Sequence, residues 1–157
     1  MKKKISFITF LFLALMLTTS TVFSQKIFIY PDGYVSLIEY TDNILAPNEY
    51  TGTYQYSQPV EDENGNYLDL DGYAQKLDLL INGDNQKLTE SLEVEGWDKP
   101  QVTNIDKFKI DENKLSTDSY SGYFRTLKYK NKKGKTIIVE CLLITQDGFE
   151  KIFVKNK

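Results

Sequence analysis

The feature that most constrains the fold is an alternation of apolar and polar residues with a period of two, which runs through most of the chain. Leu77, Leu79 and Ile81, for example, fall on one side of an extended backbone. No stretch of adequate length has a helical period, although 41–47 and 68–74 could each hold a short helical turn. The pattern predicts an all-β fold. The predicted strands are 26–30, 34–40, 49–57, 75–81, 87–94, 105–110, 115–119, 122–129, 136–144 and 149–155.

Clusters of Gly, Pro, Asn and Asp separate many of these strands, as in Pro31-Asp32-Gly33 and Asn82-Gly83-Asp84-Asn85. Such residues favour tight turns, so consecutive strands are expected to pair as antiparallel hairpins. A long meander leaves exposed edges unless the sheet closes or folds on itself. We therefore expect an antiparallel meander that closes into a barrel, with a two-sheet β-sandwich as the alternative.

The N-terminal residues 1–24 have the layout of a secretory signal peptide. Three lysines at positions 2–4 precede an apolar run over 5–17, and Val22-Phe23-Ser24 offers a cleavage site before Gln25. The run is shorter than the roughly 20 residues that span a bilayer. We expect an exported protein, periplasmic or secreted, with no membrane span after cleavage. Residues 25–157 then form a single antiparallel β domain.

Composition excludes several classes of function. Removing the three signal lysines from the 19 basic residues leaves 16 against 22 acidic residues, a net charge of −6. This balance argues against nucleic acid, which requires basic residues to replace phosphate counterions. Histidine is absent, which removes the commonest general base and most zinc sites. We therefore expect a protein that is not an enzyme and holds no cofactor or metal.

Cys141 is the only cysteine, so the chain forms no internal disulfide. It alternates in phase with Ile137, Val139 and Leu143, which predicts that all four side chains point inward. The expected role of Cys141 is that of a buried structural thiol, because a reactive cysteine needs an accessible, electropositive setting.

The most acidic stretch, residues 61–71, places oxygen-bearing side chains at Asp62, Asn64 and Asn66. It does not match an EF-hand, because Tyr67 and Tyr73 occupy the positions of the required glycine and glutamate. We interpret it as a solvated loop, with a cation site of another kind as the alternative.

Two short segments carry a family resemblance. Gly52-Thr53-Tyr54 opens an early strand, and Thr117-Asp118-Ser119-Tyr120 precedes a late one. Together with the strand order, they resemble the calycin group, which comprises lipocalins and lipocalin-like bacterial barrels. Calycins commonly have tryptophan where Tyr54 stands here, and Ser119 interrupts their Thr-Asp-Tyr motif. The resemblance implies a barrel that encloses an apolar cavity.

Tyrosines supply the candidate binding residues. Tyr54 and Tyr56 share one strand face, and Tyr123 and Tyr129 share another with Arg125, the only arginine. Such stripes either pack in a core or line a concave site. We predict that these five residues bind a small, partly apolar or amphipathic ligand without catalysis, and that Arg125 pairs with an anionic group. The alternative is an envelope-associated protein-interaction module, an inhibitor or adaptor, with a protein partner.

Overall fold

The computed structural model describes residues 25–61, 64, 67–94, 96–146 and 148–157. The predicted signal peptide lies outside these residues. The described part contains eleven strands, and every pairing between them is antiparallel, which confirms the all-β antiparallel prediction. The strands are β1 (Lys26–Ile29), β2 (Gly33–Asp42), β3 (Gly52–Glu61), β4 (Tyr67–Asn82), β5 (Asn85–Val94), β6 (Gln101–Ile105), β7 (Phe108–Asp111), β8 (Lys114–Thr117), β9 (Ser121–Lys130), β10 (Thr136–Gln146) and β11 (Phe149–Lys155).

The strands form one open sheet with the order β1-β2-β9-β10-β11-β3-β4-β5-β6, to which the β7–β8 hairpin is added beside β9. Strands β1 and β6 end this order and do not pair with each other in the described chain, so the sheet is not closed into the expected barrel. Most consecutive strands form hairpins as predicted. However, β2 pairs with β9 and β11 pairs with β3, so the sheet is not a simple meander.

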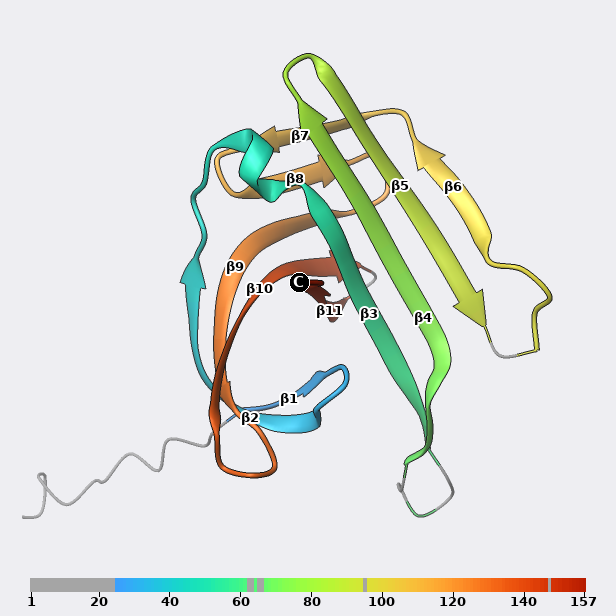
Figure 1. Cartoon of the computed structure of the whole chain (residues 1–157), viewed down its shortest axis with the longest axis vertical. Coiled ribbons are helices and arrows are strands. Elements are labelled where there is room, and N and C mark those ends of the chain that lie inside the picture. Colours follow the sequence, from blue (N-terminus) through green and yellow to red (C-terminus); the bar gives the residue numbers. More distant parts are fainter. Residues whose placement is uncertain (1–24, 62–63, 65–66, 95, 147) are drawn as a thin grey trace, which may run out of the picture.

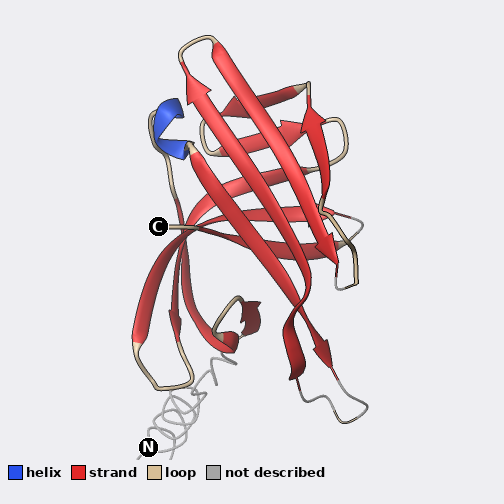
Figure 2. Cartoon of the chain, turned by 45° about the vertical axis from the view of Figure 1, so that its right-hand side comes forward, coloured by secondary structure: helices blue, strands red, loops and turns tan. Residues whose placement is uncertain are grey.

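The sheet folds on itself so that two parts of it face each other. Figures 1 and 2 show β3–β5 as a layer that crosses the strongly curved strands β9–β11. The two layers are joined by a short ladder in which Val154 pairs with Gln55 and Lys155 pairs with Tyr54. The arrangement therefore resembles the alternative sandwich, although hydrogen bonds at this corner keep it one sheet.

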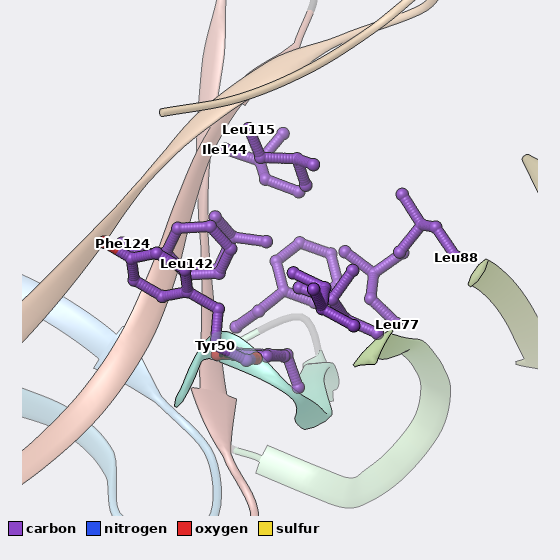
Figure 3. Close-up of a cluster of buried hydrophobic side chains, with 11 residues drawn as sticks. Tyr50, Leu77, Leu88, Leu115, Phe124, Leu142 and Ile144 are labelled. Carbon is purple, nitrogen blue, oxygen red and sulfur yellow. Dashed lines mark hydrogen bonds between the residues drawn. The ribbon is translucent and has the colours of Figure 1, made fainter. Parts of the chain in front are cut away.

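One core lies between the two layers and is called the interlayer core below. Its members come from both layers and from the short 3₁₀ helix η1 (Pro47–Tyr50), and Figure 3 shows seven of them pointing toward one another. Alternation along β4 and β10 supplies Leu77 and Leu142 to it from opposite sides. The buried members are Tyr50, Tyr54, Leu77, Leu79, Ile81, Leu88, Leu115, Phe124, Leu142, Ile144 and Phe153.

A second core lies on the other face of β9–β11, where the β1–β2 hairpin covers it; we call it the Cys141 core. Cys141 and Leu143 are buried there, and Ile137 and Val139 pack against them, which confirms the predicted inward face. Burial raises the pKa of the Cys141 thiol to about 12, an effect that the nearby charge of Arg125 partly opposes. The buried members are Ile27, Ile29, Val35, Leu127, Tyr129, Cys141, Leu143 and Ile152.

Three local predictions are wrong. Strand β4 begins at Tyr67, so the segment 68–74 is extended and not helical. The helical turn is η1 at Pro47–Tyr50, which overlaps the predicted segment 41–47 only at Pro47. The predicted strand 105–110 is divided into β6 and β7, because the chain leaves one layer for the other at Asp106 and Lys107. None of the helical turns in the described ranges is long and apolar enough to cross a membrane.

Candidate functional site

The space between the layers is polar at one end. Gln75 lies two residues before Leu77 on β4, so it faces the same interlayer space, and it is buried with 6% exposure. Glu90 pairs with Leu77 across the β4–β5 ladder, and Lys151 pairs with Ile144 across the β10–β11 ladder. Since paired residues in a ladder share a face, all three polar side chains point between the layers.

Gln75 is the centre of a group joined by hydrogen bonds and cation–π contacts, which we call the Gln75 cluster: Tyr56, Tyr73, Gln75, Glu90 and Lys151. The ammonium Nζ of Lys151 lies 3.3 Å from Gln75 Oε1, and Tyr73 Oη donates to the same oxygen over 3.5 Å. Gln75 Nε2 donates to Glu90 Oε1. The amide therefore connects a cation to an anion, which stabilises the charges inside the fold.

Two tyrosine rings hold the lysine of this cluster. Lys151 Nζ lies 5.8 Å from the ring centroid of Tyr56 and 6.0 Å from that of Tyr73. The Tyr56 ring also packs on Phe153, with 5.6 Å between centroids, and so connects the cluster to the interlayer core. Burial raises the pKa of both phenols, so they remain neutral and present their π faces to the ammonium group.

The turn between β8 and β9 brings Tyr120 to the same end of the interlayer space. Thr117 Oγ1 accepts hydrogen bonds from the backbone N–H groups of Ser119 and Tyr120 at 3.2 and 3.0 Å, and it lies 3.0 Å from the Tyr120 carbonyl oxygen. The phenol Oη of Tyr120 is buried and has no hydrogen-bond partner within the described ranges. Its pKa is raised, mainly by burial and also by the charge of Glu90.

A cleft of about 470 Å³ opens at this polar end, between β5 and β6 on one side and the β8–β9 turn on the other. Glu90, Asp106 and Asp118 contribute three carboxylates, whereas Lys107 contributes one ammonium group. Ile105 and the Tyr120 ring extend the interlayer core into the cleft. The remaining lining is made of hydroxyl and amide side chains: Thr103, Asn104, Thr117, Ser119 and Gln146. A cleft of this size and lining can hold a small molecule by apolar contact and hydrogen bonds.

The structure separates the five site residues that the sequence predicts. Tyr56 belongs to the Gln75 cluster, whereas Tyr54 lies in the interlayer core, where its Oη donates to the carbonyl oxygen of Tyr50 at 2.7 Å. Tyr123, Arg125 and Tyr129 lie on the opposite face of β9, on the side of the Cys141 core. The five residues therefore do not line one common site.

Arg125 has close partners on that opposite face. Its Nε lies 3.3 Å from Asp42 Oδ1, although the N–H is not aligned for a hydrogen bond. The guanidinium carbon lies 5.6 Å from the Tyr123 ring centroid and 5.8 Å from that of Tyr40. Tyr129, also on this face, donates its hydroxyl hydrogen to Asp32 Oδ2 at 2.7 Å. The guanidinium group of Arg125 thus interacts with one carboxylate and two aromatic rings at the edge of the Cys141 core.

Sequence reasoning missed Gln75, Glu90, Tyr120 and Lys151. A signal for two of them was present, because Gln75 and Glu90 are polar residues in phase with the apolar sides of their strands. A polar residue at a position where the alternation predicts an apolar one either interrupts the hydrophobic core or points a functional group inward. The pairing with Lys151 and Tyr120 depends on distant strands and has no local signal.

A second groove, of about 460 Å³, lies over β9, β10 and the C-terminal residues. Ile138 lines it and is 61% exposed. Its strand charges are mutually satisfied, because Lys155 Nζ lies 3.0 Å from Glu140 Oε2 and donates to the Glu49 carbonyl oxygen at 2.8 Å. In this groove the Glu140 carboxylate already has a lysine partner, whereas no ion pair of Glu90 is found within the described ranges.

The acidic stretch 61–71 does not support a binding site. Asp62, Glu63, Gly65 and Asn66 fall outside the described residues. Among the residues whose positions are described, no group of three or more cysteine, aspartate or glutamate side chains is arranged to hold a metal ion.

Comparisons with protein-family models, with curated proteins and with solved structures find no match for this chain. The resemblance to calycins therefore stays an expectation from the sequence.

Proposed function

We propose that the protein is a noncatalytic binding protein that takes a small, partly apolar ligand into the cleft beside Tyr120. The observation that carries this proposal is the cleft itself, whose wall includes Tyr120, a residue with a buried hydroxyl that has no partner in the described structure. Leaving a buried hydroxyl without a hydrogen bond costs about 1–3 kcal/mol, so such groups usually have a partner from protein, water or ligand. The Tyr120 oxygen is not exposed to the cleft, so a ligand would supply this partner by displacing the Tyr120 side chain.

The composition of the cleft supports the same function. Ile105 and the ring of Tyr120 give an apolar wall, and Glu90 and Thr103 give inward polar groups on neighbouring strands. Binding sites for small molecules combine a mainly apolar wall with a few oriented polar groups. The proposed ligand is therefore amphipathic, with its apolar part toward the interlayer core.

We further propose that residues 1–24 direct export, so that binding takes place in the periplasm or outside the cell. The role is of the kind that the calycin resemblance implies, but the ligand would lie at the edge of a folded-over sheet instead of inside a closed barrel. Recovery of the exported protein with residues 1–24 still attached would contradict this part of the proposal.

A pair of variants on β6 tests the binding site. Thr103 lines the cleft, whereas its neighbour Val102 is 62% exposed. The exported wild-type protein is expected to retain a small molecule in native mass spectrometry. Thr103→Trp should fill the cleft and remove that molecule, while Val102→Trp should keep it. A wild-type protein with no bound molecule and no response to small amphipathic probes in NMR titrations would contradict the proposal.

The second candidate is the protein-interaction module. Strand β6 ends the sheet order and pairs only with β5 among the described strands, and both Val102 and nearby Trp97 are at least half exposed. An exposed sheet edge can add a strand from a partner protein. If this is the function, Val102→Lys should abolish a cross-linked complex from the cell envelope, and Thr103→Trp should not.

A further inference from the structure

We infer that the ligand of the cleft carries a protonated amine, whose ammonium group lies beside the Glu90 carboxylate and the ring of Tyr120. This inference depends on the proposed binding function and specifies the chemical class of the ligand. It follows from three features of the cleft: an incompletely used carboxylate, a tyrosine ring in the wall and a surplus of negative charge.

The carboxylate of Glu90 is only partly used by the protein. One of its oxygens accepts a hydrogen bond from Gln75 Nε2, and no other hydrogen bond or ion pair reaches the group within the described part of the chain. Lys151, the cation of the Gln75 cluster, is bonded to the opposite end of the Gln75 amide. Glu90 therefore has capacity to accept a hydrogen bond from a charged donor in the cleft.

The phenol of Tyr120 is suited to the same donor. Its ring attracts a cation placed over its face, and its buried oxygen becomes an acceptor for the ammonium group once the side chain moves. The Glu90 carboxylate lies near enough to Tyr120 to contribute, after burial, to the raised pKa of its phenol. The protein does not join them by a hydrogen bond, and both line the cleft that would hold the ligand.

The charges of the rim select the sign of the ligand. Asp106 and Asp118 add two carboxylates to that of Glu90, and Lys107 is the one basic residue of the described lining. An anionic ligand would meet like charges, whereas a cation is attracted throughout its approach. Ile105 leaves room for an apolar body behind the ammonium group.

Three probes of similar shape separate charge from size: phenethylamine, 2-phenylethanol and 3-phenylpropanoate. NMR titrations of the exported protein are expected to show that phenethylamine binds at least about tenfold more tightly than 2-phenylethanol, because it adds a charge-assisted hydrogen bond. The anion, 3-phenylpropanoate, should bind most weakly. The perturbed amides should lie on β5, β6 and the β8–β9 turn.

Glu90→Gln tests the carboxylate, because glutamine can still accept the hydrogen bond from Gln75. It should remove the roughly tenfold preference for phenethylamine. Glu93→Gln is the matched control, since Glu93 lies on the same strand but faces away from the cleft and pairs with Lys76. If Glu90→Gln does not fold, Asp118→Asn at the exposed rim should weaken phenethylamine binding about threefold while leaving 2-phenylethanol unchanged.

Equal binding of all three probes, or a preference for phenethylamine that persists in a folded Glu90→Gln variant, would overturn the inference and leave the binding function intact. If the wild-type protein binds none of the probes and carries no molecule of its own, the binding function fails together with it.

Discussion

Arg125 and Lys151 each lie near two tyrosine rings, but on opposite faces of the curved strands. Arg125 is at the edge of the Cys141 core, where the carboxylate of Asp42 approaches it directly. Lys151 points between the layers and reaches the carboxylate of Glu90 only through the amide of Gln75. A cation therefore lies directly beside a carboxylate in one region and is connected to a carboxylate through an amide in the other.

This difference separates a structural arrangement from a candidate binding site. At Arg125 the guanidinium group and the 59% exposed carboxylate of Asp42 attract each other directly, although Arg125 Nε has no hydrogen-bond partner in the described structure. At Lys151 the amide relay stabilises both charges but leaves hydrogen-bonding capacity on Glu90, beside the cleft and the unpartnered Tyr120 hydroxyl. An aromatic and charged residue pattern alone does not distinguish these two cases.

The largest expected effect comes from removing the relay. Gln75→Leu keeps the side-chain volume but leaves Lys151 and Glu90 without their buried partner, so it should lower the free energy of unfolding by about 3 kcal/mol. Asp42→Leu, the corresponding change beside Arg125, should cost less than about 1 kcal/mol, because the Asp42 side chain is 59% exposed. Urea denaturation measures both. Equal costs would remove the distinction between the two regions.

Local features of the sequence were sufficient to predict much of the fold. Alternation and turn residues predicted the all-β class, most strands and the inward face of Cys141, because these depend on neighbouring residues. They could not predict that β2 pairs with β9 or that β11 pairs with β3. The alternation also did not predict that Leu142 and Ile144 are buried on the other face of β10. Both faces of this strand are covered because distant segments of the chain pack on each of them.

The candidate site was less predictable than the fold. Arg125 was predicted to bind the ligand because it is the only arginine, but the rarity of a residue type does not determine where its side chain lies. Tyr56 was identified from its stripe and lies in the Gln75 cluster. The remaining groups come from β4, β5, β11 and the β8–β9 turn, and only the folding of the sheet brings them together.

Alkaline pH should destabilise the protein through the Cys141 core, at whose edge Arg125 lies. The Cys141 thiol has its pKa raised from 9.0 to about 12 in the folded protein, so the unfolded chain loses this proton first as the pH rises. The free energy of unfolding should then fall between about pH 9 and pH 12. Between about pH 8 and pH 10.5, wild type should lose about 2 kcal/mol more than Cys141→Ala. Urea denaturation at the two pH values tests this, and equal losses would contradict it.

Two tyrosine hydroxyls provide the next contrast, since one is satisfied within the fold and the other is not. Tyr50 Oη accepts a hydrogen bond from Leu45 N at 2.9 Å and lies 2.9 and 3.0 Å from the carbonyl oxygens of Asn43 and Glu112. Tyr50→Phe should lower the free energy of unfolding by about 1–2 kcal/mol. Tyr120→Phe should leave it unchanged or raise it by up to about 1 kcal/mol, because it removes a buried hydroxyl without a partner. Thermal denaturation in the absence of ligand compares them, and a destabilised Tyr120→Phe would show that its hydroxyl has a partner.

The smallest expected effect is at Arg125, and it decides between the two faces of the sheet. Arg125→Met should lower the free energy of unfolding by less than about 1 kcal/mol and leave phenethylamine binding unchanged, because its partners lie away from the cleft. Lys151→Met is the counterpart on the other face, and it should weaken phenethylamine binding by releasing Gln75 from its fixed orientation toward Glu90. NMR titration measures both affinities. If binding instead fails in Arg125→Met and survives in Lys151→Met, the ligand is held on the face of Tyr123, Arg125 and Tyr129 that the tyrosine stripes predicted.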